Sequence, residues 1–87
     1  MKSNVDWTAI PFSEYPLVAS LKLIRTHRRW KKETIYSNHD KTRYYHKDPL
    51  HGEVEFYDKR GNHLGVLTPD GELHPTKGRV KGRRISI

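Results

Sequence analysis

Residues 42–68 read TRYYHKDPLHGEVEFYDKRGNHLGVLT, and this stretch decides the fold. Short runs rich in aromatic and β-branched residues alternate in it with pairs that are typical of turns, such as Asp48-Pro49 and Gly61-Asn62. The same kind of run recurs on both sides of the stretch. These runs predict strands at residues 34–37, 42–47, 52–58, 63–68 and 83–87.

The N-terminal part follows a different pattern. Leu17, Leu21 and Ile24 recur at helical spacing after Pro16, which a first helical turn tolerates. We therefore predict a short helix near residues 14–26. Together these elements predict an α+β, mainly β fold, in which a small and strongly twisted antiparallel sheet of about five strands packs against one short N-terminal helix.

Length and composition limit the protein to one small domain. The 87 residues contain 33% apolar residues and have a mean hydropathy of −0.94, so little material is available for a core. The absence of cysteine excludes disulfides, thiolate metal ligands and thiol nucleophiles. We expect packing and backbone pairing alone to stabilise the fold.

The charge is uneven along the chain. The formal net charge of +7 favours a polyanionic partner, which could be RNA, DNA or an anionic membrane. Residues 1–20 carry a net charge of −1, residues 21–47 +7, residues 48–75 −4, and residues 76–87 +5. An acidic centre therefore lies between two basic arms, and it needs an explanation of its own.

No segment is suited to cross a membrane. The most apolar run, residues 17–24, is eight residues long and contains Lys22, whereas a helical span needs about 20 residues. Asp6 and Glu14 interrupt any apolar run of the kind that forms a secretory signal. We expect the protein to act in the cell that makes it or to be delivered by another segment.

The acidic centre contains an alternating row of polar side chains. Successive residues of a strand point to opposite faces, which separates this row from Val54 and Phe56. The row consists of His51, Glu53, Glu55 and Tyr57. Neighbouring carboxylates repel each other unless a cation approaches, and a histidine titrates near neutral pH. The alternative is an ordinary solvated strand face, on which such residues are common.

Three motifs follow one another in the C-terminal half. They are His51-Gly52-Glu53-Val54-Glu55 with Tyr57, then Gly61-Asn62-His63-Leu64-Gly65, then Lys77-Gly78 with Arg83-Arg84-Ile85. In this order they resemble the cytotoxic ribonuclease domain of the E-group colicins and cloacin, which cleave 16S ribosomal RNA. The resemblance covers about residues 40–87. It implies a single ribonuclease domain over residues 1–87, with a divergent helical and basic segment at 1–39 and a catalytic sheet at 40–87.

The resemblance also implies the residues of the site. The catalytic positions fall on Asp48, His51, Glu55 and Arg83. Supporting positions fall on Glu53, Tyr57 and His63. One departure from the family pattern is Lys47, which stands where the family has an aromatic residue. His63 could equally be a structural histidine.

These residues suit the cleavage of RNA without a metal ion. The 2′-hydroxyl is the nucleophile, so the reaction needs a base for its proton, an acid for the departing 5′ oxygen and a cation for the phosphorane. We expect Glu55 to be the base, His51 to be the acid, oriented by Asp48, and Arg83 to hold the phosphate. The reverse assignment of Glu55 and His51 stays open.

The basic arms suit phosphate contacts. We expect RNA to be bound by Arg43, Lys77, Arg79, Lys81 and Arg84. Trp30, within the run Arg28-Arg29-Trp30-Lys31-Lys32, could stack on a base or lie at the edge of the core. The target RNA is expected to be structured or single-stranded, because side chains cannot read the deep groove of an RNA duplex.

Two other functions stay open. A non-catalytic RNA-binding module of ribosomal-protein type fits the size, charge and strand pattern, although carboxylates on its binding face would repel phosphates. A metal-dependent nuclease is the second, although His51, Glu53 and Glu55 lack a recognised metal-ligand spacing. We expect no metal and no other cofactor.

The resemblance implies partners and a place of action as well. The substrate would be 16S ribosomal RNA at the decoding centre of the small ribosomal subunit. The cell that makes such a nuclease must restrain it, which implies an acidic immunity protein or antitoxin. The chain would act in a bacterial cytoplasm, as a stand-alone toxin or as an excised domain of a larger secreted toxin.

Overall fold

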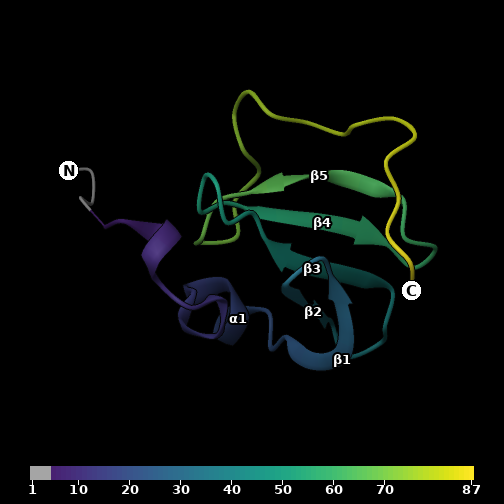
Figure 1. The fold of residues 1–87 in the computed structure, drawn as a ribbon, viewed down its shortest axis with the longest axis horizontal. Coiled ribbons are helices and arrows are strands. Elements are labelled where there is room, and N and C mark those ends of the chain that lie inside the picture. The colour runs from purple at the N-terminus through teal and green to yellow at the C-terminus, as the bar shows by residue number, and fades with distance from the viewer. Residues whose placement is uncertain (1–4) are drawn as a thin grey trace.

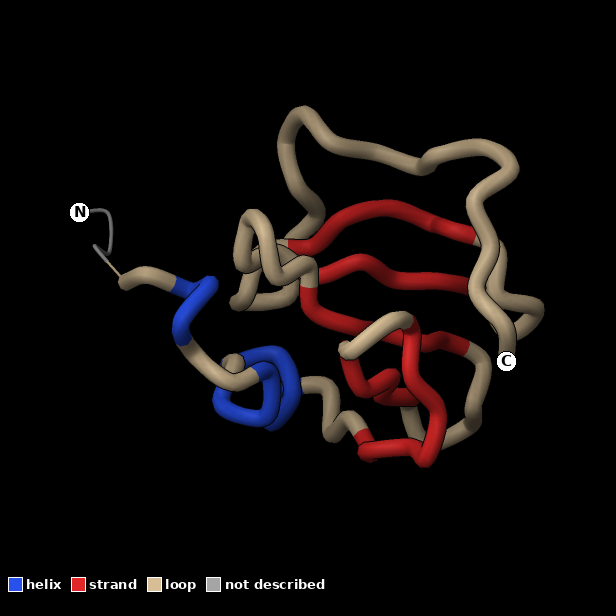
Figure 2. Tube along the Cα trace, in the orientation of Figure 1, coloured by secondary structure: helices blue, strands red, loops and turns tan. Residues whose placement is uncertain are grey.

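The computed structural model describes residues 5–87, and residues 1–4, the start of the predicted N-terminal segment, lie outside the described part. The fold is a five-stranded antiparallel sheet preceded by short helical turns (Figures 1 and 2). The strands are β1 (Ile24–Trp30), β2 (Glu33–Ser37), β3 (Arg43–Lys47), β4 (Val54–Asp58) and β5 (His63–Leu67). They lie side by side in chain order, and every pair is antiparallel. The predicted fold class is confirmed, and four of the predicted strands correspond to β2, β3, β4 and β5.

The predicted helix at 14–26 is wrong in its extent. The α-helix α1 covers only Pro16–Ser20, after two 3-10 turns, η1 (Trp7–Ala9) and η2 (Phe12–Glu14). The helix stops because Lys22 adopts a left-handed conformation with φ of 53°, and the Leu23 amide bonds back to the Val18 carbonyl. The chain then enters β1, where the sequence predicts no strand.

The predicted strand at 83–87 is also wrong. We call residues 76–87 the C-terminal strap; it runs beyond β5 and returns past the ends of β5 and β4 (Figure 1). Its backbone pairing with the rest of the chain consists of an isolated bridge between Asn62 and Arg84 and two bonds, from the His63 amide to the Arg83 carbonyl and from the Ile85 amide to the Gly61 carbonyl. The strap therefore meets the turn after β4 and the first residue of β5. Gly61 permits this approach, because a Cβ there would lie 2.3 Å from the Ile85 carbonyl oxygen.

The sheet has a hydrophobic cluster on each face. Neighbouring residues of one strand enter different clusters, as Tyr44 and Tyr45 do on β3. The first cluster is larger and joins the sheet to the helical turns through Phe12, Tyr15, Leu17, Leu23, Tyr36, Tyr45, Val54 and Leu67. The second lies under the C-terminal strap and consists of Ile35, Tyr44, Tyr57 and Ile85.

The helical turns hold the loop between β3 and β4. We call residues 7–20 the N-terminal clamp. The Lys47 ammonium group donates to the carbonyls of Thr8, at 2.9 Å, and Ile10, at 2.6 Å. The Tyr15 hydroxyl lies 2.7 Å from the Gly52 carbonyl oxygen. Lys47, the departure from the family pattern, therefore fixes the clamp to the end of β3.

Within residues 5–87, no helix has the length and apolar character that crossing a bilayer requires.

Candidate active site

Five predicted site residues line one pocket. The pocket has a volume of about 310 Å³ and lies between the tip of the β1–β2 hairpin, the β3–β4 loop, β4 and the C-terminal strap. The predicted residues in its wall are Asp48, His51, Glu55, Tyr57 and Arg83. Trp30, Lys31, His46, Pro49 and Leu50 complete the lining. Residues from four separate parts of the chain therefore converge on one site.

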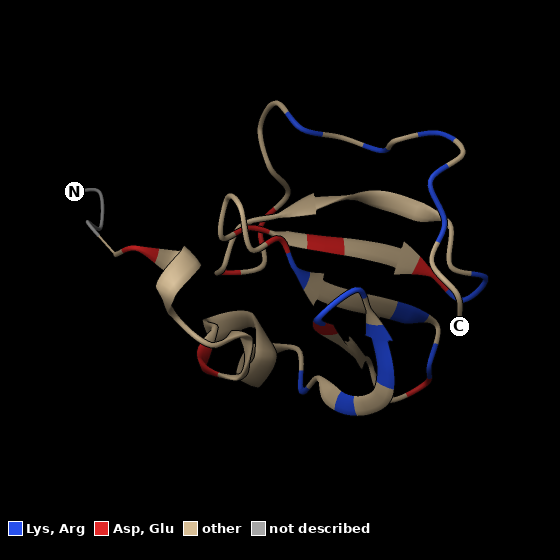
Figure 3. Ribbon diagram, viewed as in Figure 1, with Lys and Arg blue, Asp and Glu red and all other residues tan. Residues whose placement is uncertain are grey.

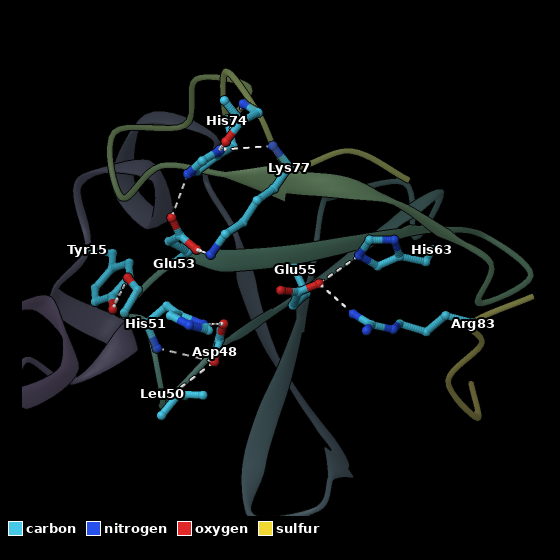
Figure 4. A network of polar contacts seen from close by, with 12 residues as sticks. Tyr15, Asp48, Leu50, His51, Glu53, Glu55, His63, His74, Lys77 and Arg83 are labelled. Carbon is cyan, nitrogen blue, oxygen red and sulfur yellow. Dashed lines mark hydrogen bonds and ion pairs between the residues drawn. The ribbon is translucent and has the colours of Figure 1, made fainter. Parts of the chain in front are cut away.

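Asp48 orients the His51 ring, as the sequence predicts. Its Oδ2 accepts a hydrogen bond of 2.8 Å from His51 Nδ1, and its Oδ1 accepts the Leu50 amide at 3.0 Å (Figure 4). Burial alone would raise the pKa of Asp48, but these hydrogen bonds outweigh it and hold that pKa below its usual value. The ionised carboxylate fixes the proton of His51 on Nδ1 and leaves Nε2 for another partner.

Glu55 uses only one of its oxygens within the protein. Oε1 accepts His63 Nε2 at 2.6 Å and Arg83 Nη1 at 3.1 Å. No buried side-chain oxygen or nitrogen among the described residues lacks a partner, so Oε2, which has none, reaches solvent at the pocket. Figure 4 shows Glu55 between the Asp48–His51 pair on one side and His63 and Arg83 on the other.

The hydrogen bonds of His63 fix its tautomer. Nδ1 accepts the Val80 amide at 2.9 Å, so the ring proton lies on Nε2 and is donated to Glu55. The His63 side chain is fully buried and does not line the pocket. It connects the C-terminal strap to Glu55 and thereby sets the direction of the carboxylate.

Tyr57 and His46 form a second buried pair. The Tyr57 hydroxyl lies 2.8 Å from His46 Nε2, and His46 Nδ1 donates to the Lys47 carbonyl at 3.0 Å. Burial lowers the pKa of His46, so its ring is neutral and accepts the Tyr57 proton. Burial, and then the charge of Glu55, raise the pKa of Tyr57. The pair is a fixed floor of the pocket.

Glu53 does not line the pocket itself, although its carboxylate lies within 4.8 Å of ligand atoms of Asp48 and His51. Gly52, between His51 and Glu53, adopts a left-handed φ of 75°, so the predicted strand alternation does not extend back to His51, and β4 begins at Val54. The Glu53 carboxylate pairs with Lys77 Nζ at 2.6 Å and with His74 Nε2 at 2.8 Å. The hydrogen bond between Glu53 and Lys77 is the main cause that raises the pKa of Lys77. Each glutamate thus has its own pair of partners, one histidine and one basic side chain.

Among residues 5–87, three side chains of the kinds that bind metal ions lie close together near the pocket. Ligand atoms of Asp48, His51 and Glu53 all lie within 4.8 Å of one another. These atoms are engaged already, because Asp48 and His51 bond to each other and Glu53 bonds to Lys77 and His74. A metal ion would have to displace protein donors.

The predicted RNA-binding residues flank the acids on separate sides (Figure 3). Arg79 and Lys81 line a second pocket of about 230 Å³, and Arg83 lines both pockets. Arg84 donates to the Arg60 carbonyl at 3.0 Å, and Arg43 is exposed on β3. The β1–β2 hairpin supplies a further basic stretch.

Sequence reasoning missed several members of the site. His46 carries a detectable signal, since it alternates with the buried Tyr44 on β3. Lys31, Pro49 and Leu50 carry none, because the hairpin tip and the loop meet only in the folded chain. The contact of Tyr15 with the Gly52 carbonyl was equally out of reach.

Comparison with known proteins agrees with the geometry. The model of the Cytotoxic family, the colicin-type cytotoxic ribonuclease domain, matches residues 25–85, which are 61 of the 87 residues. The match begins before residue 40 and includes β1 and β2. No curated protein matches the chain. The family match indicates a toxic nuclease as the general function of the chain. The chain belongs to the cytotoxic ribonuclease domain family of the E-group colicins.

Proposed function

We propose that the chain is a metal-independent endoribonuclease toxin that cleaves 16S ribosomal RNA at the decoding centre and so stops translation. The observation that carries the chemistry is the pocket in which Glu55, the Asp48–His51 pair and Arg83 converge. The family membership supports a nuclease, and the basic arms favour a polyanionic substrate.

The proposed reaction is an internal transesterification. Glu55 Oε2 removes the proton of the ribose 2′-hydroxyl, and the 2′ oxygen attacks phosphorus while the bond to the 5′ oxygen breaks. His51 Nε2 gives its proton to that departing oxygen. The products are a 2′,3′-cyclic phosphate and a 5′-hydroxyl. Arg83, half exposed at the pocket, stabilises the charge on the phosphorane.

The positions of the hydrogen bonds favour this assignment over its reverse. Glu55 Oε2 is unengaged, as a base requires, and His63 and Arg83 hold the carboxylate in one orientation. Asp48 accepts the hydrogen bond of His51 Nδ1 and so directs Nε2, the nitrogen that would give up its proton, away from the carboxylate. The reverse assignment of Glu55 and His51 predicts the same products. The two assignments are therefore distinguished by the pH dependence of the cleavage rate in single variants of these residues.

The partner that restrains the nuclease is proposed to be acidic. Five exposed basic residues of the β1–β2 hairpin have no acidic ion-pair partner among residues 5–87. They are Arg25, Arg28, Arg29, Lys31 and Lys32. An immunity protein or antitoxin with acidic groups would complement this surface. We propose the bacterial cytoplasm, where ribosomes are found, as the place of action.

The test is primer extension across 16S ribosomal RNA after incubation with intact ribosomes. We expect one major stop with the wild type, none with Glu55→Gln, and an unchanged stop with Glu72→Gln, a control acid that is exposed on another loop. Random degradation, or cleavage that survives Glu55→Gln, would contradict the proposal. Retained RNA binding by Glu55→Gln separates loss of chemistry from loss of binding.

Metal dependence is tested on a short 16S fragment, because chelators dissociate ribosomes. Cleavage in excess chelator with cyclic phosphate ends supports the mechanism. A strict requirement for a divalent ion would instead support a metal site at Asp48, His51 and Glu53.

A further inference from the structure

The proposed mechanism leaves one wall of the pocket unused. Glu55, His51 and Arg83 serve the phosphodiester, but Trp30, Lys31 and Leu50 line the same space. Two of these three side chains are apolar. A phosphodiester alone gives no reason for an apolar wall, since its oxygens require donors and cations.

Trp30 is held rigidly in this wall. Its ring stacks on His46 with centroids 4.7 Å apart and an interplanar angle of 11°. His46 is itself fixed at both nitrogens by the Tyr57 hydroxyl and the Lys47 carbonyl. The indole is therefore positioned before any ligand arrives, and such preorganisation favours binding.

Leu50 stands at the mouth of the pocket with 76% of its surface exposed. Its backbone is fixed, because its amide donates to the Asp48 oxygen opposite the one that holds His51. Asp48 thus positions the apolar rim and the imidazole together. An exposed, positioned leucine beside a reactive group is suited to contact a flat apolar ligand.

Lys31 lies over the indole, with Nζ 4.5 Å from the ring centroid. Its side chain is exposed and flexible, so a stacking ligand can replace the ammonium group at the ring. The displaced cation would remain close enough to the pocket to pair with a phosphate.

We propose that Trp30 and Leu50 bind the nucleobase next to the scissile phosphodiester, with the base stacked on the indole and covered by the leucine. This inference rests on the proposed ribonuclease activity. Bases stack on aromatic side chains of single-strand-binding proteins, and each has a flat apolar face that suits this wall. The base site would position the adjoining phosphate against Glu55 and His51.

The test is direct binding that needs no cleavage. The chain has two tryptophans, so Trp7→Phe leaves Trp30 as its one indole fluorophore. The probes are 2′-O-methyl RNA hexamers, which have no free 2′-hydroxyl, and an abasic hexamer of equal charge. We expect base-containing hexamers to quench Trp30 fluorescence, and the abasic hexamer to bind about 5- to 100-fold more weakly with little quenching.

Leu50→Ser tests the rim, and Leu73→Ser is its matched control, since Leu73 is 71% exposed and lies outside the pocket. Leu50→Ser is expected to weaken hexamer binding severalfold, whereas Leu73→Ser is not. Equal binding and quenching by the abasic hexamer, or equal effects of the two serine variants, would overturn the base site. Failure of the ribonuclease proposal would appear separately, as intact 16S RNA.

Discussion

The Tyr15 hydroxyl lies 2.7 Å from the Gly52 carbonyl oxygen and 2.9 Å from that of Trp7. Tyr15 belongs to the N-terminal clamp, and Gly52 follows His51 in the loop that carries the proposed acid. The hydroxyl proton is shared between two carbonyls that are 45 residues apart in the chain. The N-terminal segment, whose role the sequence alone left open, thus supports the active-site loop.

Tyr15→Phe is expected to lower the free energy of unfolding at neutral pH by about 1 kcal/mol, since one buried hydrogen-bonding group is lost and the ring stays. Burial, then the charges of Glu33, Asp48 and Asp6, raise the pKa of Tyr15 to about 12. The unfolded chain ionises this group near pH 10, so its contribution is complete below pH 10 and is lost as pH rises through 12.

Urea titrations from pH 8 to 12 measure this effect. The free energies of unfolding of the wild type and of Tyr15→Phe should converge with rising pH, because only the wild type loses the Tyr15 contribution. A constant gap across this range would show that the hydroxyl does not titrate as the structure requires.

Substitution of glycines by alanine should separate backbone strain from steric overlap. Gly52 has φ of 75°, and a Cβ there would lie 2.8 Å from Trp7 Cβ. Gly82 has φ of 86° with open space around it, and Gly78 has neither constraint. We expect the free energy of unfolding to fall by about 2–4 kcal/mol in Gly52→Ala, by about 1 kcal/mol in Gly82→Ala and hardly at all in Gly78→Ala. Thermal denaturation measures the order, and equal effects would contradict the close packing at Gly52.

Asp48→Asn is expected to cost about 1–2 kcal/mol at pH 6, because the hydrogen bonds of its carboxylate are charge-assisted. The pKa of Asp48 is depressed in the folded state, so its contribution is complete above an unfolded value near 3.8 and is lost as pH falls further. The gap to the wild type should therefore narrow below pH 4 in melting curves. Asp40→Asn, at an exposed pair with His39, is the control and should change little.

His63→Ala is expected to loosen the C-terminal strap. It removes the acceptor of the Val80 amide and the donor to Glu55, which leaves a backbone group without its partner. Limited trypsin digestion with mass spectrometry should show faster cleavage after Arg79 and Lys81. His39→Ala, at an exposed pair with Asp40 far from the strap in sequence, is the control. A strap that stays equally protected in both variants would show that His63 does not hold it.

The strands could be predicted because their signals are local. Val54 and Phe56 alternate with Glu55 and Tyr57, and in the structure Val54 and Phe56 belong to one hydrophobic cluster whereas Tyr57 belongs to the other. The predicted helix at 14–26 is too long because Leu17, Leu21 and Ile24 have helical spacing in the sequence but do not form one buried face in the structure. Leu17 is buried, whereas Leu21 and Ile24 are 42% and 49% exposed. The left-handed Lys22 interrupts the helix between Leu21 and Ile24, and a lysine gives no sequence signal for this conformation.

The candidate site was predictable where its residues are close in sequence. The Asp48–His51 pair spans three residues and depends on one turn. The prediction of a regular row from His51 to Tyr57 was wrong, because the left-handed Gly52 interrupts the alternation between His51 and Glu53, and the Glu53 carboxylate turns to Lys77 and His74. Trp30 could not be assigned from sequence, because its role depends on which ring it stacks on. That ring, His46, is brought to it by the sheet.

The strand order has a consequence for how the protein gains activity. Each strand pairs only with its neighbours in the chain, so the sheet can assemble one hairpin at a time without closing a long loop. Tyr15 meets Gly52 across 37 residues, and Arg83 meets Glu55 across 28, so we expect these contacts to form last. Tyr15→Phe should then delay the recovery of cleavage after refolding more than the recovery of the sheet signal in circular dichroism. A newly made chain would be folded but harmless for a short time, and an inhibitor could bind it in that interval.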